Sequence, residues 1–373
     1  MFTGYKKIKL FSELSLQILV TSCVFMFPSF VESSARVFEV RGVQVDVTAN
    51  TAADAREQAL GNGEGAAFNI LLKRLTLLND HDRLPTFDKT TISEYVRDFE
   101  VVEEKISTIR YLAKINFRFK IQEIRKLLSE SGFRFAESVS EPFLVLPVYQ
   151  NSEVKRFWDH PNLWREAWEN NTEKTGLVPF IYPQGDLRDI GLIDADQALN
   201  GDYEAFSEIA KLYKTSSIAV VHAILSKLKN STDFLEVFIA IHAGKERTLI
   251  KPIRIIQEEG EGERALLERS VKLVVNIINN KWKEANLLDL KQSNIAAFTI
   301  PITGLNDWLF IETRLRSVFL ISRIEMVLLS LDEVRINVHY RGEMRQLEKA
   351  LNQSNLSLVK EDSELVLYTF DKD

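Results

Sequence analysis

Residues 109–119 read Ile-Arg-Tyr-Leu-Ala-Lys-Ile-Asn-Phe-Arg-Phe, and apolar and polar side chains alternate along most of this stretch. A period of two places the apolar side chains on one face of a β-strand. We therefore predict a strand with one buried face, preceded by a shorter strand over 101–107. A helix over 121–131, ended by Gly132, is predicted to follow it.

The residues before this strand predict a second strand and a long helix. Alternating valines over 37–47 indicate a half-buried strand, and Thr51-Ala-Ala-Asp54 is typical of a helix start. The predicted inner face of the helix is made of small residues: Ala52, Ala55, Ala59, Gly63, Ala66 and Ile70. A face without bulk lets a helix lie close to a sheet, although Gly61, Gly63 and Gly65 also predict a possible break.

The element order predicts an α/β (α+β) protein with three domains. Through residue 139 the order is β-α-β-β-α-β, and the last eighty residues repeat it. We predict two small ferredoxin-like β-α-β-β-α-β units, over 36–140 and 291–373, that flank a larger α/β domain with a mixed sheet over 141–290. In the central domain, turns at 230–232 and at Gly244 separate three predicted strands.

The first 35 residues have the order typical of a secretory signal peptide. Three lysines within residues 6–9 are followed by an apolar run over 14–30 and by small residues that end at Ala35. We predict cleavage after Ala35, which leaves no stable membrane span. Two alternatives stay open, namely an uncleaved membrane anchor and a lipid attached to Cys23.

Composition narrows the classes of partner and cofactor. The chain has 373 residues, 45% hydrophobic and 27% charged, with a formal net charge of −6. This charge offers no basic surface for nucleic acid or for an anionic membrane. The only cysteine, Cys23, lies in the predicted signal peptide, so we expect no disulfide and no thiolate metal site in the mature chain. No cofactor is predicted.

No strong catalytic motif occurs in the chain, and the candidate residues each have two interpretations. Trp164 and Trp168 are four residues apart on one face of a predicted helix, where they form either core or an exposed platform for a sugar or peptide. The loop with Gly185, Asp186 and Asp189 supplies either an acid/base pair, as glycoside hydrolysis needs, or a turn in which Asp186 bonds its own backbone.

A pair of histidines was considered as a metal site. His222 and His242 lie on two strands of one predicted hairpin, where they face each other if the register allows. Two imidazoles need a third ligand to hold zinc, and no carboxylate stands at an obvious spacing. Half-buried sheet histidines are therefore expected, and neither a metal site nor a catalytic residue is assigned.

Several motifs of the chain resemble the family called domain of unknown function 2066 (DUF2066). The matching residues are Val43-x-Val45-Asp46-Val47-Thr48-Ala49, Ala53-x-Ala55-Arg56, Leu71-Leu72-x-Arg74-Leu75, Leu146-Pro147-Val148-Tyr149, Trp164-x-x-x-Trp168, Pro183-x-Gly185-Asp186-Leu187 with Asp189, Asp307-Trp308, and Tyr340-x-Gly342 with Leu347 and Leu351. The resemblance implies an exported protein of Gram-negative bacteria, hence a periplasmic one, with no established activity. The central unit also resembles α/β domains of curli-secretion and Tol-translocation lipoproteins, at the level of fold alone.

These observations favour an exported periplasmic interaction or scaffold protein that binds another protein, or a glycan, of the cell envelope. Two alternatives remain. One is a glycan- or peptide-processing hydrolase centred on Asp186 and Asp189, with Trp164 and Trp168 beside them. The other is a small-ligand binding protein.

Overall fold

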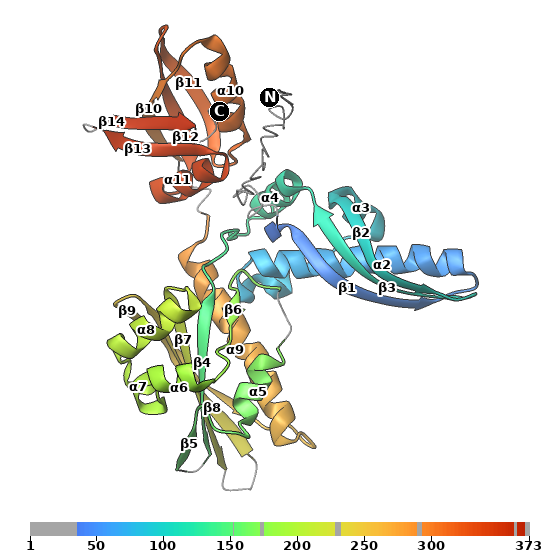
Figure 1. Ribbon diagram of the computed structural model, residues 1–373. Helices are drawn as coiled ribbons and strands as arrows, with labels where there is room; N and C mark the ends of the chain where they lie inside the picture. The colour runs from blue at the N-terminus through green and yellow to red at the C-terminus, as the bar shows by residue number, and fades with distance from the viewer. Residues whose placement is uncertain are drawn as a thin grey trace, which may run out of the picture. The chain divides into compact units, whose positions relative to one another are not determined.

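The computed structural model describes residues 36–151, 153–171, 175–227, 233–288, 293–361 and 364–369. These residues form three β-sheets with helices packed against them, which confirms the α+β class (Figure 1). The predicted signal peptide with Ala35 and Cys23, and the predicted turn at 230–232, lie outside the described residues.

The amino-terminal sheet is built around the stretch that alternates most clearly. Its strands are β1 (Glu39–Thr48), β2 (Val96–Ile106) and β3 (Arg110–Phe119), in the order β1-β3-β2, and both neighbouring pairs are antiparallel. Ile115 and Phe117 of the central strand β3 are fully buried, as the alternation predicts.

The fourth strand of the predicted ferredoxin-like unit is missing from the described part of this sheet. After α4 (Ile121–Glu130) the chain makes a single bridge, between Thr76 and Phe135, and forms no strand of this sheet. The three strands otherwise keep the order expected for that unit. A short helix that was not predicted, α3 (Lys89–Tyr95), precedes β2.

The glycines of the long helix α2 (Ala52–Leu75) do not break it. The Thr51 hydroxyl accepts a hydrogen bond of 3.1 Å from the Asp54 amide, which confirms the predicted helix start. The buried face runs through Ala59, Gly63 and Ala67, so the prediction that Ala66 faces inward was wrong by one position. A Cβ on Gly63 would lie 2.9 Å from Phe117 Cζ and 3.1 Å from Val45 Cγ1, so α2 rests directly on β1 and β3.

Gly63→Ala is expected to lower the free energy of unfolding by about 1 to 2 kcal/mol, because the added methyl overpacks against Phe117. Gly65→Ala is the matched control. Its Cβ would have its nearest neighbour, Ile92 Cδ1, at an ordinary 3.9 Å, so better helix propensity should raise stability by about 0.5 to 1 kcal/mol. Urea unfolding followed by circular dichroism measures both changes. Equal effects at the two positions would contradict the close packing of α2.

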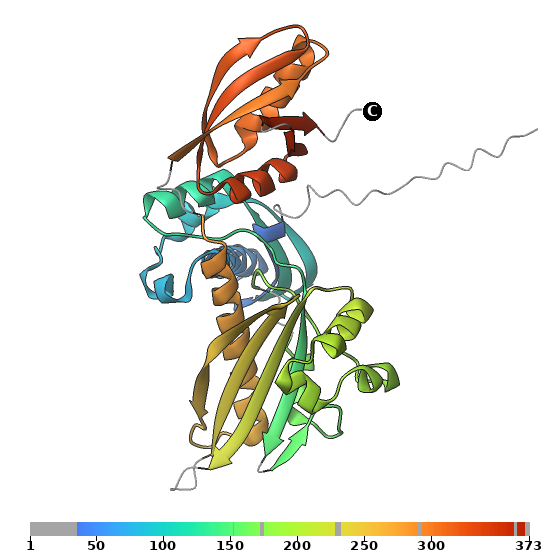
Figure 2. The ribbon, with the colours of Figure 1, turned by 90° about the vertical axis from the view of Figure 1, so that its left-hand side faces the viewer.

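The central sheet is mixed and is covered on both faces. Its strands are β4 (Phe143–Asn151), β5 (Val154–Arg156), β6 (Phe180–Ile181), β7 (Ser217–Lys227), β8 (Asp233–Ala243) and β9 (Glu246–Ile256). The order is β5-β4-β7-β8-β9, with β4 parallel to both β7 and β6. Figure 2 shows the long helix α9 (Glu263–Ala285) on one side of this sheet and the group α6 (Leu187–Leu192), α7 (Ala195–Asn200) and α8 (Tyr203–Tyr213) on the other.

Helices cover both faces of the central sheet, and this explains why the sequence of β4 is almost continuously apolar. Val145 packs in the cluster formed with α9, whereas Leu144 and Leu146 pack in the cluster formed with α6–α8. A strand buried on both sides needs apolar residues at every position. The short strand β6 consists of Phe180 and Ile181, which pair with Phe143 and Leu144 of β4.

The carboxy-terminal sheet departs from the predicted ferredoxin-like order in its last two strands. Its strands are β10 (Ser293–Pro301), β11 (Ile321–Leu329), β12 (Glu333–Arg341), β13 (Leu356–Glu361) and β14 (Glu364–Thr369), in the order β11-β12-β10-β14-β13. The final strand β14 inserts beside β10 and runs parallel to it, which leaves β13 at the margin. Two helices, α10 (Leu305–Ser317) and α11 (Met344–Gln353), contribute buried side chains to its core.

Candidate functional site

The two tryptophans considered for a binding platform lie in the interior. Trp164 and Trp168, on α5 (Leu163–Glu169), are fully buried between this helix and the central sheet. Their rings meet edge-on, with centroids 5.7 Å apart, and Trp164 Nε1 donates a hydrogen bond of 3.1 Å to Val221 O. They occupy the positions that the core interpretation expects, and they present no aromatic surface to a sugar or peptide.

The two aspartates of the Gly185 loop hold the backbone in place. Asp186 is the N-cap of α6 and accepts hydrogen bonds from the amides of Arg188 (2.9 Å) and Asp189 (3.1 Å). These backbone donors lower the pKa of the Asp186 carboxyl. Asp189 is fully buried, where its carboxylate accepts from the Gly185 amide at 2.7 Å and from the Tyr213 hydroxyl at 2.8 Å.

An arginine that the sequence did not single out anchors this loop. The buried Arg165 donates from Nη2 to Gln184 O and from Nε to Glu169 Oε1 at 2.8 Å. A Cβ on Gly185 would lie 2.2 Å from Arg165 Nη1, and Gly185 has a φ of +70°. Glycine is therefore required here for both space and backbone conformation. Arg165 lies between the two tryptophans in sequence, and that was the available signal for its burial.

The arrangement assigns Gly185, Asp186 and Asp189 a structural role, in which they fix the start of α6 against α5 and α8. A general acid/base pair needs two carboxylates that both reach a substrate. Here the Asp189 carboxylate is buried and accepts hydrogen bonds from groups inside the protein, whereas the Asp186 carboxylate caps α6.

Asp189→Ala is expected to lower the free energy of unfolding by roughly 2 to 3 kcal/mol, because the Tyr213 hydroxyl and the Gly185 amide lose their buried acceptor. Asp186→Asn is the matched comparison, and should change stability by less than about 0.5 kcal/mol, because asparagine is an equally good N-cap. Chemical denaturation measures both. A stable Asp189→Ala variant would show that this carboxylate does not hold the loop.

The two histidines of the β7–β8 hairpin do not face each other. His222 lies opposite Phe238, and His242 lies opposite Ile218. On β7, Ile218 and His222 are four positions apart, so the two histidines are offset along the hairpin. The hydrogen bond of His222 goes instead to Gln150 Oε1, at 3.2 Å. Among the described residues, no group of three His, Cys, Asp or Glu side chains converges in a way that could hold a metal ion.

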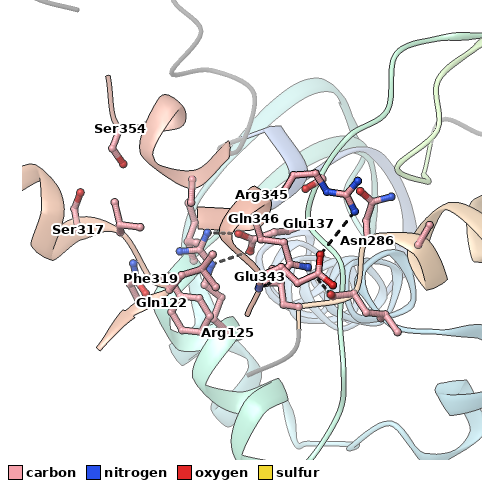
Figure 3. Close-up of a pocket in the computed structure, with 18 of the residues that line it drawn as sticks. Gln122, Arg125, Glu137, Asn286, Ser317, Phe319, Glu343, Arg345, Gln346 and Ser354 are labelled. Carbon is pink, nitrogen blue, oxygen red and sulfur yellow. Dashed lines mark hydrogen bonds and ion pairs between the residues drawn. The ribbon is translucent and has the colours of Figure 1, made fainter. Parts of the chain in front are cut away.

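A polar pocket of about 330 Å³ lies where α4, the end of α9 and α11 come together (Figure 3). Arg125 and Glu137 form a bidentate ion pair in it, with distances of 2.8 and 2.6 Å, and the Arg125 guanidinium stacks 4.9 Å from the centre of the Phe319 ring. Gln346 Nε2 donates to Leu287 O at 2.7 Å. These interactions join segments from the amino-terminal, central and carboxy-terminal parts, so these lining groups serve as structural links.

A second pocket, of about 580 Å³, lies beside α8 at the start of β7. Phe206 and Ile218 contribute apolar surface, and His242 packs edge-on against Phe206 with ring centroids 4.6 Å apart. Burial lowers the pKa of His242. The charged residues that line this pocket, Glu141, Lys211 and Lys214, are all exposed, so none of them is held in a fixed position that would define a ligand.

The carboxyl end of α2 is capped by a buried lysine from α9. Lys283 Nζ donates to Lys73 O at 3.0 Å and also to Thr76 O. A cation at this position suits the negative end of the α2 dipole. Burial away from water nevertheless lowers the pKa of Lys283 to about 8.

The stability of the protein is expected to rise with pH between about 8 and 10.5, relative to a Lys283→Met variant. In this window the unfolded chain holds a proton on Lys283 that the folded chain has released, so the free energy of unfolding increases with pH. Between pH 7.5 and 9.5 the difference between the two proteins should grow by about 1 to 2 kcal/mol. Lys281→Met, at an exposed position on the same helix, should show no such trend. A flat difference would contradict the burial of the Lys283 charge.

Large apolar side chains are exposed on the outer strand of the amino-terminal sheet, in the turn that follows it, and at Leu112 of β3, which lies on the opposite face of the sheet. Phe99 lies opposite the buried Phe117, and Ile106 opposite the buried Tyr111, so both point toward the helix-covered face. The long helix α2 packs on β1 and β3, and Phe99 and Ile106 remain 40% and 56% exposed. We call these residues the β2 edge cluster, and they are between 38% and 56% exposed: Phe99, Val102, Ile106, Ile109 and Leu112.

Comparisons with protein-family models and with curated proteins yield no match. Among solved structures, the crystal structure of the lipoprotein GNA1162 from Neisseria meningitidis aligns with 37% of this chain and 96% of its own, at 11% sequence identity and a TM-score of 0.24. A likeness at this score carries no argument about fold or function. Within the part of the chain that the structure describes, no helix has the length and apolar character needed to cross a membrane.

Proposed function

We propose that this protein is an exported component of the bacterial cell envelope that binds another envelope protein through the β2 edge cluster. The observation that carries the proposal is the exposure of five large apolar side chains on β2, in the turn after it and on β3, next to an edge of β2 that pairs with no other strand in the described part of the chain. Such a row of apolar side chains beside free backbone groups is a site for an added strand from a partner.

Charged side chains near the β2 edge cluster favour a protein partner that binds in one defined position along the strand. Glu100 lies 3.6 Å from Arg118, and Glu103 lies 3.8 Å from Lys114, so paired charges occupy the open face of the sheet, opposite to the face toward which Phe99 and Ile106 point. Apolar contacts supply affinity, whereas a polar rim restricts the partner. A glycan is supported less well, because the tryptophans that would stack on a sugar are buried.

The compartment is proposed on sequence grounds. The order of the first 35 residues is that of a signal peptide, and the motifs shared with DUF2066 favour the periplasm of a Gram-negative bacterium. An edge strand with exposed apolar residues also promotes aggregation. A partner that stays bound to this edge in the envelope would prevent such aggregation.

Site-specific photocrosslinking tests the proposal. A photoreactive amino acid at Val102, in cells that produce the protein normally, is expected to give one reproducible adduct with an envelope protein after irradiation. The same amino acid at Glu57, exposed on the outer side of α2, should give no such adduct. Ile106→Lys in the Val102 background should reduce the adduct at least tenfold, because a charge enters the apolar contact.

The purified partner and the purified protein must then bind each other, and Ile106→Lys must weaken this binding at least tenfold. Because Ile106 is more than half exposed, this variant should keep the thermal midpoint of the parent protein. Identical adducts at Val102 and Glu57, or none at Val102 under conditions where the protein is abundant, would remove the β2 edge as the binding site.

A further inference from the structure

The outermost strand of the carboxy-terminal sheet, β11, has a free edge and a short regular stretch. Among the described residues, its only neighbour in the sheet is β12. The pairing with β12 shifts register between Ile321 and Arg323 and again between Met326 and Leu328. The regular part of the strand is therefore 323–326, which is paired residue by residue with 336–339.

This edge carries two bulges and two charged side chains, but lacks other features that protect a strand from pairing with another chain. The sequence of β11 contains no lysine and no proline. Four consecutive apolar side chains, Met326, Val327, Leu328 and Leu329, are between 42% and 62% exposed. The helix that leads into the strand, α10, also exposes Leu305, Leu309 and Phe310. The register shifts keep the regular stretch short, so a partner strand must match it closely.

We infer that β11 pairs in antiparallel orientation with β11 of a second copy of this protein. Arg323 and Glu325 are two positions apart, so they lie on the same face of the strand, where they form an ion pair of 2.7 Å. With a two-fold axis at Ile324, Arg323 of one copy lies opposite Glu325 of the other, and the reverse pair forms on the other side of the axis. The strand is self-complementary in this register.

The two registers shifted by one residue to either side oppose like charges, and those centred on Ser322 or Met326 place no opposite charge across from Arg323 or Glu325. An axis at Arg323 places the two arginines opposite each other, and an axis at Glu325 does the same with the two glutamates. Like charges directly opposite each other destabilise a strand pair, whereas opposite charges stabilise it. Charge therefore selects the register centred on Ile324, and the two sheets join into one across the dimer axis.

Sedimentation measurements on the exported full-length protein test this pairing. Arg323→Glu and Glu325→Arg are each expected to weaken self-association at least tenfold, since each variant opposes like charges. The double variant, with both charges exchanged, restores the complementarity and should return the dissociation constant to within about threefold of the parent value. Arg335→Glu is the control, because it breaks a comparable ion pair of 3.0 Å, with Glu333 on β12, away from the free edge.

Disulfide trapping tests the register directly. In a Cys23→Ser background, Ile324→Cys is expected to form an intermolecular disulfide on mild oxidation, because residues at the axis have Cβ atoms about 4.5 to 5.5 Å apart. Met326→Cys should not form one, since its counterpart lies four residues along the strand pair, about 13 Å away.

A protein that stays monomeric at all accessible concentrations would overturn the inference. A dimer that is insensitive to both single charge reversals, or that crosslinks at Met326→Cys and not at Ile324→Cys, would overturn it as well. None of these results bears on the β2 edge cluster, because β2 and β11 belong to different sheets.

Discussion

The contact of α2 with β1 and β3 decides which surfaces of the amino-terminal sheet are closed. Gly63 allows the helix axis to approach Phe117 and Val45 so closely that a methyl group would not fit without displacement. The main contacts of α2 with the sheet are with β1 and β3. The apolar side chains Phe99, Val102 and Ile106 of the outer strand β2 remain partly exposed to solvent. The proposed function depends on these exposed side chains.

Elsewhere, the polar groups that are buried hold segments together. Lys283 of α9 caps the end of α2, Arg125 and Glu137 join the segments around the polar pocket, and Asp189 closes the Gly185 loop against Tyr213. Each group has its partners inside the protein, as buried polar groups require. These buried groups are thus used for assembly, whereas the surface offers strand edges and apolar side chains.

Local sequence patterns predicted the elements well where one physical rule dominates. The alternation over 109–119 and the capping residue Thr51 correspond to β3 and to the start of α2. Strand order was predicted less well, because the insertion of β14 beside β10 depends on pairing between distant segments. The roles of Asp189 and Arg165 also depend on burial, which comes from tertiary packing and leaves little trace in the spacing of residues.

The central claim is that the β2 edge is covered when the protein is in the cell envelope. Thiol labelling of a Val102→Cys variant, in a Cys23→Ser background, measures this directly. We expect rapid labelling by a membrane-impermeant maleimide in purified protein and strong protection in intact envelopes, whereas Glu57→Cys should be labelled equally in both. Equal labelling of Val102→Cys in the two settings would contradict it.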